Sequence, residues 1–569
     1  MSRRPRENPF LTDWRPLCGS AHKLCPLSRE LRESNGEAMP TLDWIGKKAV
    51  ENHHDEVPYR LIHCDGDASA GDPGASNLLV QGDNLEALRA LLPYYAGRVK
   101  CIYIDPPYNT GSEDWVYNDN VNSPEIRAWL GKVVGKEAED LSRHDKWLCM
   151  MYPRLTLLRR LLAPTGVIAV SSDENELTYL RLAMGDVFGD ANFLGYVAWK
   201  TRNVDNRVKS KLSTDHEYVT IFALDGSIRG RVIDRSGYKN PDGDHRGPYV
   251  TDPLTGKATA ARRPNLHYDM TNPATGDVYE PDPSRGWITD YEGYRSLLDA
   301  KLIHWPPDPS KGKPRKKRFA ADGNERMPVS SFWPDIKGQS GADELDQIMG
   351  RRVFDFPKSM EFMTYMLDLI ADEDAIVLDS FAGSGTTGHA VLDLNARDGG
   401  NRRFILVEMD ESIARDVTAE RLRRVSNGYD KGGDPSKPVK GLGGGFRYCT
   451  LGTPLFDEFG DIAEAVTFPD LAAHVFFSET GAPIPRRATS PLLGVHDGKA
   501  IYLLFDEALA GRPRKTAGNV LTLDTLADLP PAPEGARPVV YAEGCTVPGE
   551  RLSGEGVAFK QIPYQVAGT

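Results

Sequence analysis

Two stretches of the chain alternate short, continuously apolar runs with longer segments in which apolar residues recur at helical spacing. Such runs predict buried strands, and the segments between them predict amphipathic helices. In the first stretch the predicted strands are 78–83, 99–105 and 167–173, and the predicted helices are 84–95, 147–162 and 175–188. In the second stretch the predicted strands are 375–380 and 403–408, and the predicted helices are 359–371, 387–396 and 411–425.

Strands that are apolar along their whole length are typical of parallel sheets covered by helices on both faces. We therefore predict an α/β fold with a doubly wound, mostly parallel sheet. Two further apolar runs, 193–199 and 217–224, would form an antiparallel edge of this sheet.

Three segments break this pattern. Residues 1–38 show no sustained period, which predicts a disordered extension. Residues 200–355 are rich in Gly, Pro, Asn, Asp and Tyr, and we interpret them as an insert. A Gly-rich linker at 428–445 precedes a small C-terminal α/β unit. The strands predicted in that unit are 474–479, 500–505 and 538–543.

Charge separates the insert from the rest of the chain. The 569 residues carry a formal net charge of −12, but segment 200–320 holds 22 basic and 16 acidic residues. Its net +6 leaves −18 elsewhere, so an anionic partner would be met by this segment. The densest basic run is 311–318. A hydrophobic share of 40% is too high for a mostly disordered chain, and no run of about 18 apolar residues predicts a membrane span.

Seven cysteines are scattered along the chain, and none forms a Cys-x-x-Cys pair. An odd number without such spacing predicts neither a disulfide framework nor a thiolate zinc site. The first residues lack the apolar core of a secretory signal. We therefore expect a protein of the reducing cytoplasm, without a bound metal.

The first candidate site is a Gly-rich segment between a predicted strand and a predicted helix. Gly383, Gly385 and Gly388 follow the strand with G-x-G-x-x-G spacing. Glu408, at the end of the next predicted strand, matches the acidic partner that holds ribose hydroxyls in nucleotide sites. His389 stands where a phosphate loop would need lysine, which excludes a Walker motif. This pattern alone leaves nicotinamide, flavin and S-adenosylmethionine open.

The second candidate site follows strand 99–105, where the prolines of Asp105-Pro106-Pro107-Tyr108 break the ladder because they have no N–H to donate. Open α/β sheets place their ligands at the carboxyl ends of strands. Asp105 and the Pro106 carbonyl each accept a hydrogen bond, and Tyr108 offers a face for stacking. This set suits a planar base with an exocyclic amine. A simple turn with a packed tyrosine is the structural alternative.

Together, IDPPYNTG (104–111) and LDSFAGSGTTGHAV (378–391) resemble the two signatures of the DNA amino-methyltransferases, D/N/S-P-P-Y/F/W and F-x-G-x-G. The catalytic motif comes first here, and a variable segment separates it from the second motif. This order resembles the permuted beta group, and specifically the modification subunits of type III restriction systems. Supporting matches are Gln81-Gly-Asp83-Asn84, His216-Glu-Tyr218 and Phe356-Pro-Lys358.

The resemblance covers 77–450 and implies a Rossmann-like methyltransferase sheet with a circularly permuted order of motifs. It implies five parts, namely the extension 1–38, a catalytic half 39–200, a target-recognition insert 201–355, a cofactor-binding half 356–450 and a C-terminal accessory domain 451–569.

The resemblance also implies roles for individual residues. The catalytic motif is Asp105, Pro106, Pro107 and Tyr108. The residues implied in binding the cofactor, S-adenosylmethionine, are Asp379, Phe381, Ala382, Gly383, Ser384, Gly385, Thr386 and Glu408, with Asp83 near its adenine and Lys358 near its carboxylate. The charge pattern makes Lys313, Arg315, Lys316, Lys317 and Arg318 the candidate DNA contacts, with a solvated loop as the alternative.

The implied reaction moves a methyl group from S-adenosylmethionine to the N6 amine of adenine in duplex DNA, by base flipping and direct in-line transfer. Cytosine-N4 methylation uses the same geometry, but aspartate rather than serine at position 105 favours adenine. The chain has no Pro-Cys dipeptide, which excludes cytosine-C5 methylation. A catalytically idle DNA-recognition subunit is the alternative of a different class. Implied partners are double-stranded DNA, a helicase and nuclease subunit for restriction, and a second copy of the chain.

Overall fold

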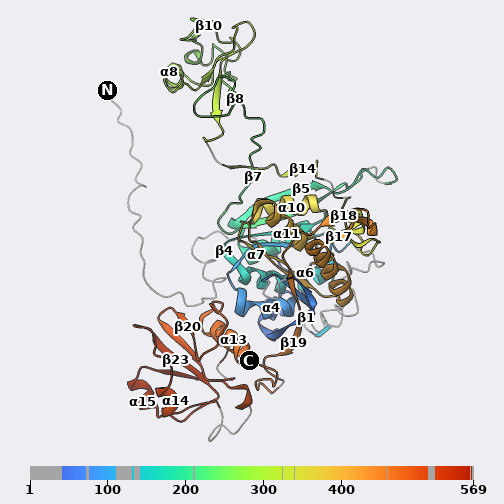
Figure 1. Ribbon diagram of the computed structural model, residues 1–569, viewed down its shortest axis with the longest axis vertical. Helices are drawn as coiled ribbons and strands as arrows, with labels where there is room; N and C mark the ends of the chain where they lie inside the picture. Colours follow the sequence, from blue (N-terminus) through green and yellow to red (C-terminus); the bar gives the residue numbers. More distant parts are fainter. Residues whose placement is uncertain are drawn as a thin grey trace. The chain divides into compact units, whose positions relative to one another are not determined.

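The computed structural model describes residues 42–71, 76–110, 131–132, 141–208, 212–322, 325–336, 338, 340–457, 459–509, 519–563 and 566. The chain divides into two compact units (Figure 1): Arg229–Val329, called the insert unit below, and the remainder, called the main unit. The extension expected over 1–38 lies outside the described residues.

A ten-stranded sheet forms the centre of the main unit, in the order β1-β19-β2-β16-β15-β3-β4-β6-β5-β14. The strands from β19 to β4 run parallel, whereas β6 runs antiparallel between β4 and β5. The bounds are Arg60–Ala70 (β1), Leu78–Gln81 (β2), Val99–Ile104 (β3), Leu162–Ser172 (β4), Phe193–Lys200 (β5), His216–Ala223 (β6), Phe332–Trp333 (β14), Ile376–Asp379 (β15), Arg403–Glu408 (β16) and Phe446–Pro454 (β19). The predicted parallel sheet and its antiparallel pair β5-β6 are confirmed.

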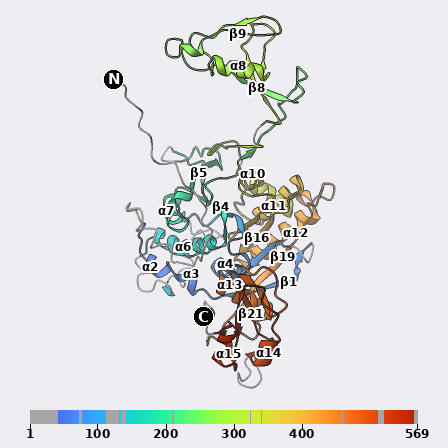
Figure 2. The same cartoon turned by 90° about the vertical axis from the view of Figure 1, so that its left-hand side faces the viewer.

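Helices cover both faces of this sheet. Figure 2 shows α6 and α7 on one side of β4, and α11 and α12 on the other side. The first layer comprises α4 (Asn84–Tyr95), α6 (Arg143–Leu161) and α7 (Leu177–Phe188), and the second comprises α10 (Met360–Ile370), α11 (Thr386–Asp398) and α12 (Glu420–Asn427). Because both faces are covered, β15 is buried at every position and β3 at all but one. The doubly wound α/β fold is therefore confirmed.

β3 and β15 are neighbours in the sheet although they lie far apart in the sequence. Cys101 pairs with Val377, and Ile102 pairs with Leu378, in parallel register. From β3 the sheet continues to β4 on one side, and from β15 it continues to β16 on the other. Doubly wound sheets bind ligands outside the carboxyl ends of strands at such a change of direction. The two candidate sites of the sequence therefore meet at one edge of the sheet.

The outer strands β1 and β19 are joined by a disulfide between Cys64 and Cys449. The cysteine spacing predicts no disulfide framework, and the structure corrects this for one pair. The two residues are 385 positions apart, and only the antiparallel pairing of β1 with β19 places them opposite each other. The spacing of cysteines along the sequence cannot reveal a disulfide between residues that only the tertiary structure brings together.

The C-terminal part of the main unit has its own four-stranded sheet, in the order β20-β21-β23-β25. Its strands are Leu492–His496, Lys499–Leu503, Arg537–Ala542 and Ala558–Gln561. The strands predicted at 500–505 and 538–543 correspond to β21 and β23. The strand predicted at 474–479 was wrong, because these residues belong to α13 (Phe468–Thr480), which begins with a capping box and packs against α4. A short apolar run does not by itself distinguish a strand from a buried helix.

The insert unit contains an antiparallel three-stranded sheet in the order β11-β12-β8, a two-stranded sheet β9-β10 and helix α8. Their bounds are Ile303–His304, Arg315–Phe319, Tyr249–Pro253, Met270–Thr271, Val278–Tyr279 and Tyr291–Asp299. A small core of aromatic and aliphatic side chains holds it together, made of Leu254, Met270, Tyr279, Trp287, Tyr294 and Ile303. The unit lies inside the segment 201–355 assigned to target recognition, while β6 and β14, at the two ends of that segment, belong to the main sheet.

Among the helices of the described residues, none combines the length and the apolar character needed to cross a membrane.

Phe362 on α10 joins the second helix layer to the sheet. Its ring is fully buried, with its centroid 4.0 Å from that of Trp199 on β5 and 6.0 Å from that of Tyr103 on β3. We predict that Phe362→Ala lowers the free energy of unfolding by about 3–5 kcal/mol, because it leaves a cavity under the sheet. Urea denaturation followed by tryptophan fluorescence measures this. Phe459→Ala, at a ring that is 81% exposed, is the control and should cost less than about 0.5 kcal/mol. Equal effects of the two changes would contradict the prediction.

Candidate functional site

The Gly-rich loop connects β15 to α11 at the carboxyl edge of the sheet. Asp379, the last residue of β15, accepts hydrogen bonds from the Phe381 backbone N–H (3.0 Å) and from the Thr387 hydroxyl (2.5 Å). Gly383 and Gly385 have φ angles of 50° and 76°, in the left-handed region that favours glycine. The two glycines therefore permit the turn. The Asp379 carboxylate holds Phe381 before the turn and Thr387 after it through these two hydrogen bonds.

Glu408 ends β16 and reaches back to the same loop. Its carboxylate accepts a hydrogen bond from the Gly383 N–H at 2.9 Å and another from the Asp410 N–H at 3.0 Å. The residue is buried, and each carboxylate oxygen has two lone pairs, so it can accept a further donor such as a hydroxyl. The structure thus places the predicted ribose-binding acid directly against the predicted glycine loop.

Arg421 on α12 supports this loop from the interior and was missed by the sequence analysis. Its buried guanidinium donates to the Ser384 hydroxyl at 3.1 Å and to the Thr386 hydroxyl at 2.7 Å. The Thr386 hydroxyl in turn donates to the Lys358 carbonyl at 3.1 Å. Arginines on a charged amphipathic helix usually face the solvent. The sequence therefore does not distinguish the buried Arg421 from the other arginines of this helix.

Buried polar contacts also hold the segment after β3. The Trp147 indole N–H donates to the Pro107 carbonyl at 2.7 Å. Asn109 adopts a left-handed φ of 56°, and its amide donates to Glu176 (2.5 Å) and to the Arg143 carbonyl (3.1 Å). Neither sequence motif implies a role for Asn109 or Glu176. The available signal was an asparagine directly after Tyr108, at the end of the motif, since asparagine tolerates left-handed backbone better than most residues.

Four polar side chains meet where this segment ends. The Tyr108 hydroxyl lies 2.9 Å from both Asp105 Oδ1 and Glu217 Oε2. The Lys358 ammonium lies 3.0 Å from Asp105 Oδ2, 3.1 Å from Glu217 Oε2 and 2.8 Å from the Tyr108 hydroxyl. We call Asp105, Tyr108, Glu217 and Lys358 the edge cluster. Glu217 comes from β6, so the cluster joins elements from three distant parts of the chain.

Burial and neighbouring charges shift the pKa values of the acids at this edge. Burial raises the pKa of Asp105, the Lys358 ammonium opposes this, and the Glu217 charge adds to it. Burial also raises the pKa of Asp379 to about 7, against the hydrogen bonds from Thr387 and Phe381. Burial alone would lower the pKa of Lys358, but the two adjacent carboxylates outweigh it and raise that pKa, so the ammonium stays charged.

Two residues predicted to bind the cofactor make other contacts in the structure. Lys358, expected near the cofactor carboxylate, directs its ammonium to the edge cluster. Asp83, expected near the cofactor adenine, caps α4 by accepting from the Leu85 N–H at 2.8 Å and pairs with Arg154 at 3.2 Å. Their contacts with the cofactor stay predictions.

The basic run is a loop only in its first part, 311–314, because Arg315–Phe319 forms the central strand of the insert-unit sheet. Side chains alternate across a strand, and Lys317 points inward to Asp242 at 2.5 Å and Asp244 at 3.0 Å. Arg318 also pairs with a carboxylate, at 3.0 Å. The five basic residues are therefore not equivalent DNA contacts, and Lys317 has a structural role.

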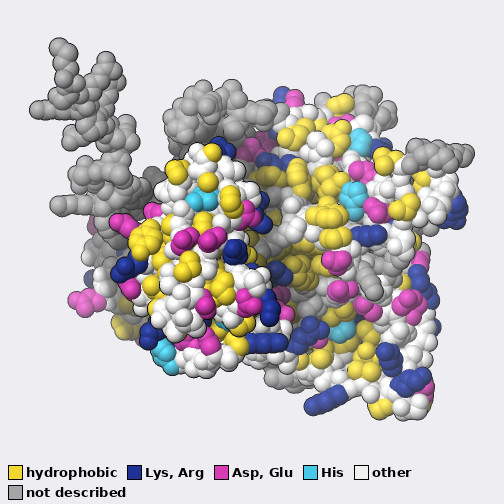
Figure 3. All heavy atoms as spheres, turned by 90° about the horizontal axis from the view of Figure 1, so that it is seen from above, with side chains coloured by type: hydrophobic (Ala, Val, Ile, Leu, Met, Phe, Trp, Pro, Cys, Tyr) yellow, Lys and Arg dark blue, Asp and Glu magenta, His cyan; other side chains and the backbone are white. Residues whose placement is uncertain are grey.

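The remaining basic side chains of the run differ in exposure. Lys313, Lys316 and Arg318 are exposed, whereas Arg315 is partly buried and donates to the Thr251 hydroxyl at 2.7 Å. Figure 3 shows Lys and Arg side chains interspersed with Asp and Glu over the face in view, rather than gathered in one basic patch. A DNA-binding role for the basic run would therefore depend on these three exposed cations.

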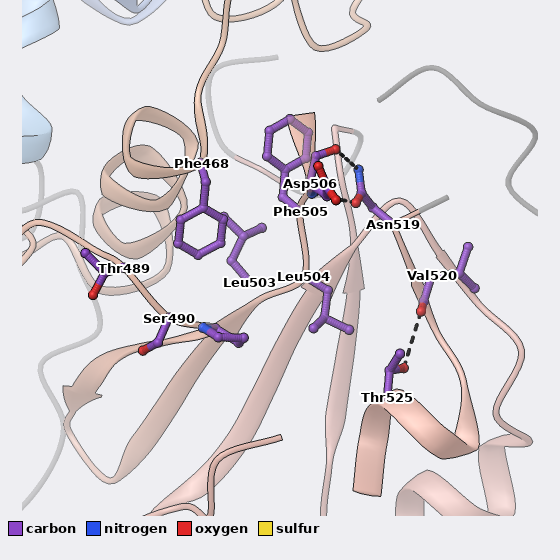
Figure 4. A pocket seen from close by; sticks show the side chains of 11 residues that line it. Phe468, Thr489, Ser490, Leu503, Leu504, Phe505, Asp506, Asn519, Val520 and Thr525 are labelled. Carbon is purple, nitrogen blue, oxygen red and sulfur yellow. Dashed lines mark hydrogen bonds between the residues drawn. The ribbon is translucent and has the colours of Figure 1, made fainter. Parts of the chain in front are cut away.

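A separate cavity of about 390 Å³ lies in the C-terminal part of the main unit. Figure 4 shows Phe468, Leu503 and Leu504 along its apolar wall. Near its rim Asn519 exchanges two hydrogen bonds with the Asp506 backbone, at 2.6 and 3.2 Å. The cavity is lined from 468–525 alone, so it is distinct from the edge of the central sheet.

Comparison with known proteins agrees with the two motifs and their geometry. A family model described as DNA methylase, of the N6 and N4 methyltransferases, matches residues 99–420. The Mod subunit of the StyLTI type III restriction-modification enzyme of Salmonella typhimurium is 32% identical over 497 residues, which are 80% of this chain and 73% of that protein.

Two further relatives belong to different systems. The EcoPI Mod subunit of Escherichia phage P1 is 31% identical over 70% of this chain and 68% of that protein. The type II methyltransferase M.KpnI of Klebsiella pneumoniae is 29% identical over 63% of this chain and 89% of that protein. With these matches spanning both motifs, the chain belongs to the S-adenosylmethionine-dependent DNA amino-methyltransferases, among the Mod subunits of type III restriction-modification systems.

Proposed function

We propose that Asp105 and the Pro106 carbonyl hold the N6 amine of a flipped adenine for methylation, and that the insert unit selects the target. One observation carries the proposal. The segment Asp105-Pro106-Pro107-Tyr108 follows β3 directly beside β15, which leads into the Gly-rich loop. The predicted amine-binding and cofactor-binding residues therefore share one edge of the sheet.

The residues at this edge fit S-adenosylmethionine. Acidic side chains converge there, since Asp105 and Glu408 both raise the pKa of Asp379 through their charges. Such a set of acidic acceptors suits a ligand that carries positive charge and hydroxyl groups. The Ser380 hydroxyl is buried and has no hydrogen-bond partner among the described residues. Glu408 would hold the ribose, and the loop from Phe381 to Thr386 would lie under the methionine part.

The cofactor supplies a methyl group already activated on a sulfonium, so the protein has to position groups rather than form a covalent intermediate. The adenine amine is a weak nucleophile because its lone pair is delocalised into the ring. Hydrogen bonds from this amine to Asp105 and to the Pro106 carbonyl direct the lone pair outward. A carboxylate with a raised pKa is a stronger acceptor, which suits Asp105 to this task.

A base in duplex DNA reaches this edge only after it leaves the stack. Extrusion costs roughly a few kcal/mol, and stacking on an aromatic ring recovers about 1–3 kcal/mol. Tyr108 offsets part of the cost, so contacts with the phosphates must supply the rest. We assign these contacts to the exposed cations of the insert unit.

The names of the relatives indicate which kind of protein this chain acts with. The StyLTI and EcoPI proteins are named as Mod subunits of type III restriction-modification enzymes. We propose that this chain likewise modifies DNA for a system whose restriction subunit is a separate protein, and that it acts as a homodimer.

Asp105→Ala should lower the single-turnover rate of methyl transfer by about 10²–10³-fold, because it removes the acceptor for the target amine. Transfer of the labelled methyl group from S-adenosylmethionine to unmethylated plasmid DNA measures the rate, and nucleoside analysis identifies the product. N6-methyladenine is expected. Label in N4-methylcytosine would select the alternative base, and no label with the native chain would indicate an idle subunit. Asp225→Ala, at an exposed turn after β6, is the matched control.

Glu408→Ala should raise the Kd for S-adenosylmethionine about tenfold or more, which corresponds to at least about 1.4 kcal/mol. The change removes the proposed ribose contact and the acceptor for the Gly383 N–H. Isothermal titration calorimetry measures the Kd. Glu411→Ala, at an exposed glutamate nearby, should leave it unchanged. An unaltered Kd in the Glu408 variant would move the cofactor site away from this loop.

Replacing Lys313, Lys316 and Arg318 together with alanine should weaken binding to target and random duplexes alike. Phosphate contacts carry no sequence information directly, so target preference should survive. The slope of log affinity against log salt should flatten by about 0.9 for each phosphate that the variant no longer neutralises. Binding titrations at several salt concentrations measure both. Alanine at the exposed Arg486, Arg537 and Arg551 of the C-terminal part changes the net charge equally and is the control. Equal slopes for the two triple variants would contradict the proposal.

A further inference from the structure

Glu217 is the member of the edge cluster to which neither motif assigns a role. It lies on β6, opposite Trp199 of β5 in antiparallel register. Its side chain is 23% exposed, and its Oε2 atom is the one that contacts the cluster. A carboxylate placed beside the lysine and tyrosine of a catalytic edge needs a reason, because two partly buried acids close together repel each other.

Both carboxylate oxygens of Asp105 already accept a hydrogen bond in this arrangement. Its Oδ1 accepts from the Tyr108 hydroxyl at 2.9 Å, and its Oδ2 accepts from the Lys358 ammonium at 3.0 Å. Each oxygen can still accept one more donor, but a target amine would then share the negative charge of Asp105 with these two donors. The tyrosine is the stronger obstacle, since a hydroxyl has one proton and directs it at one acceptor.

Glu217 offers both donors a second acceptor at nearly the same distance. Its Oε2 lies 2.9 Å from the Tyr108 hydroxyl and 3.1 Å from the Lys358 ammonium. The Tyr108 proton can therefore turn from Asp105 to Glu217 and remain hydrogen-bonded. The Lys358 ammonium has three protons and can stay between the two carboxylates.

We propose that Glu217 is a positioning residue for methyl transfer, which holds the Tyr108 hydroxyl and the Lys358 ammonium so that Asp105 Oδ1 is left to the target amine. The inference rests on the proposed role of Asp105. Glu217 touches neither the amine nor the methyl group, and it acts through Tyr108 and Lys358.

The same geometry has an electrostatic consequence. Because Lys358 is shared by two carboxylates, it stabilises the ionised form of Asp105 less than it would if it were paired with Asp105 alone. Without the Glu217 charge, Lys358 would bind Asp105 more tightly, and Asp105 would be a poorer acceptor. The ionisable groups that face Asp105 are Tyr103, Tyr108, Glu217, Lys358 and Asp379.

The sign of the pH effect follows. Methyl transfer needs Asp105 ionised, so the rate falls as the pH falls through the pKa of Asp105. The negative charge of Glu217 raises that pKa. Glu217→Gln keeps the size of the side chain and removes the charge, so it should move the acid limb of the pH profile to lower pH.

The test uses single-turnover transfer of labelled methyl groups to unmethylated plasmid DNA, with the full chain. Glu217→Gln should slow the reaction about 10- to 100-fold. The Kd for S-adenosylmethionine and the concentration of DNA at half-saturation should stay within about twofold of the native values, which also shows that the variant is folded. Glu174→Gln, at an exposed glutamate whose carboxylate lies outside the cluster, is the matched control and should behave as the native chain.

A double-mutant cycle separates positioning from a general structural effect. If Glu217 acts through the Tyr108 hydroxyl, Glu217→Gln should cost less in a Tyr108→Phe background than in the native chain. The inference would be overturned if the two changes lowered the rate additively and Glu217→Gln left the acid limb of the pH profile in place. A native rate for Glu217→Gln, or a raised Kd of that variant for S-adenosylmethionine, would also overturn it. Asp105→Ala is measured in parallel. Activity in that variant would overturn the proposed function itself, whereas an inactive Asp105 variant with a native Glu217→Gln rate would overturn only this inference.

Discussion

The parallel pairing of β3 with β15 is the constraint on which the active edge depends. Each strand carries one motif at its carboxyl end, and the register of Cys101 against Val377 sets how far apart the motifs lie. Both strands are buried between two helix layers, so neither can shift without disturbing the packed core. The chemistry is thus placed by rigid elements, which a reaction that relies on positioning requires.

Support for the edge comes from side chains outside the motifs. Arg421 holds the Gly-rich loop from α12, and Glu176 holds the segment after β3 through Asn109. Glu217 reaches the edge from β6. Each is wholly or largely withdrawn from water, so its hydrogen bonds are strong and removing one partner is costly. The motifs carry the groups that we propose take part in methyl transfer, and these residues hold the segments that bear them.

The insert unit, to which we assign target recognition, is built differently from the edge of the main sheet. The insert unit has a small core of its own, half of which is aromatic, and carries four residues of the densest basic run on its central strand. Alternation along that strand divides the run, because Lys317 is turned inward to two aspartates while Lys316 faces outward. A count of basic residues therefore overstates the charge that this strand can present to DNA.

The sequence by itself determined the parallel sheet, its two helix layers and the two motifs, because each depends on local periodicity or on adjacent residues such as Asp105 and Pro106. Tertiary structure alone decided the Cys64–Cys449 disulfide, the helix at 474–479 and the placement of Glu217 and Lys358. The physical reason is the range of the interaction. A strand or a turn follows from neighbours along the chain, whereas a shared proton or an ion pair depends on which distant strands lie side by side.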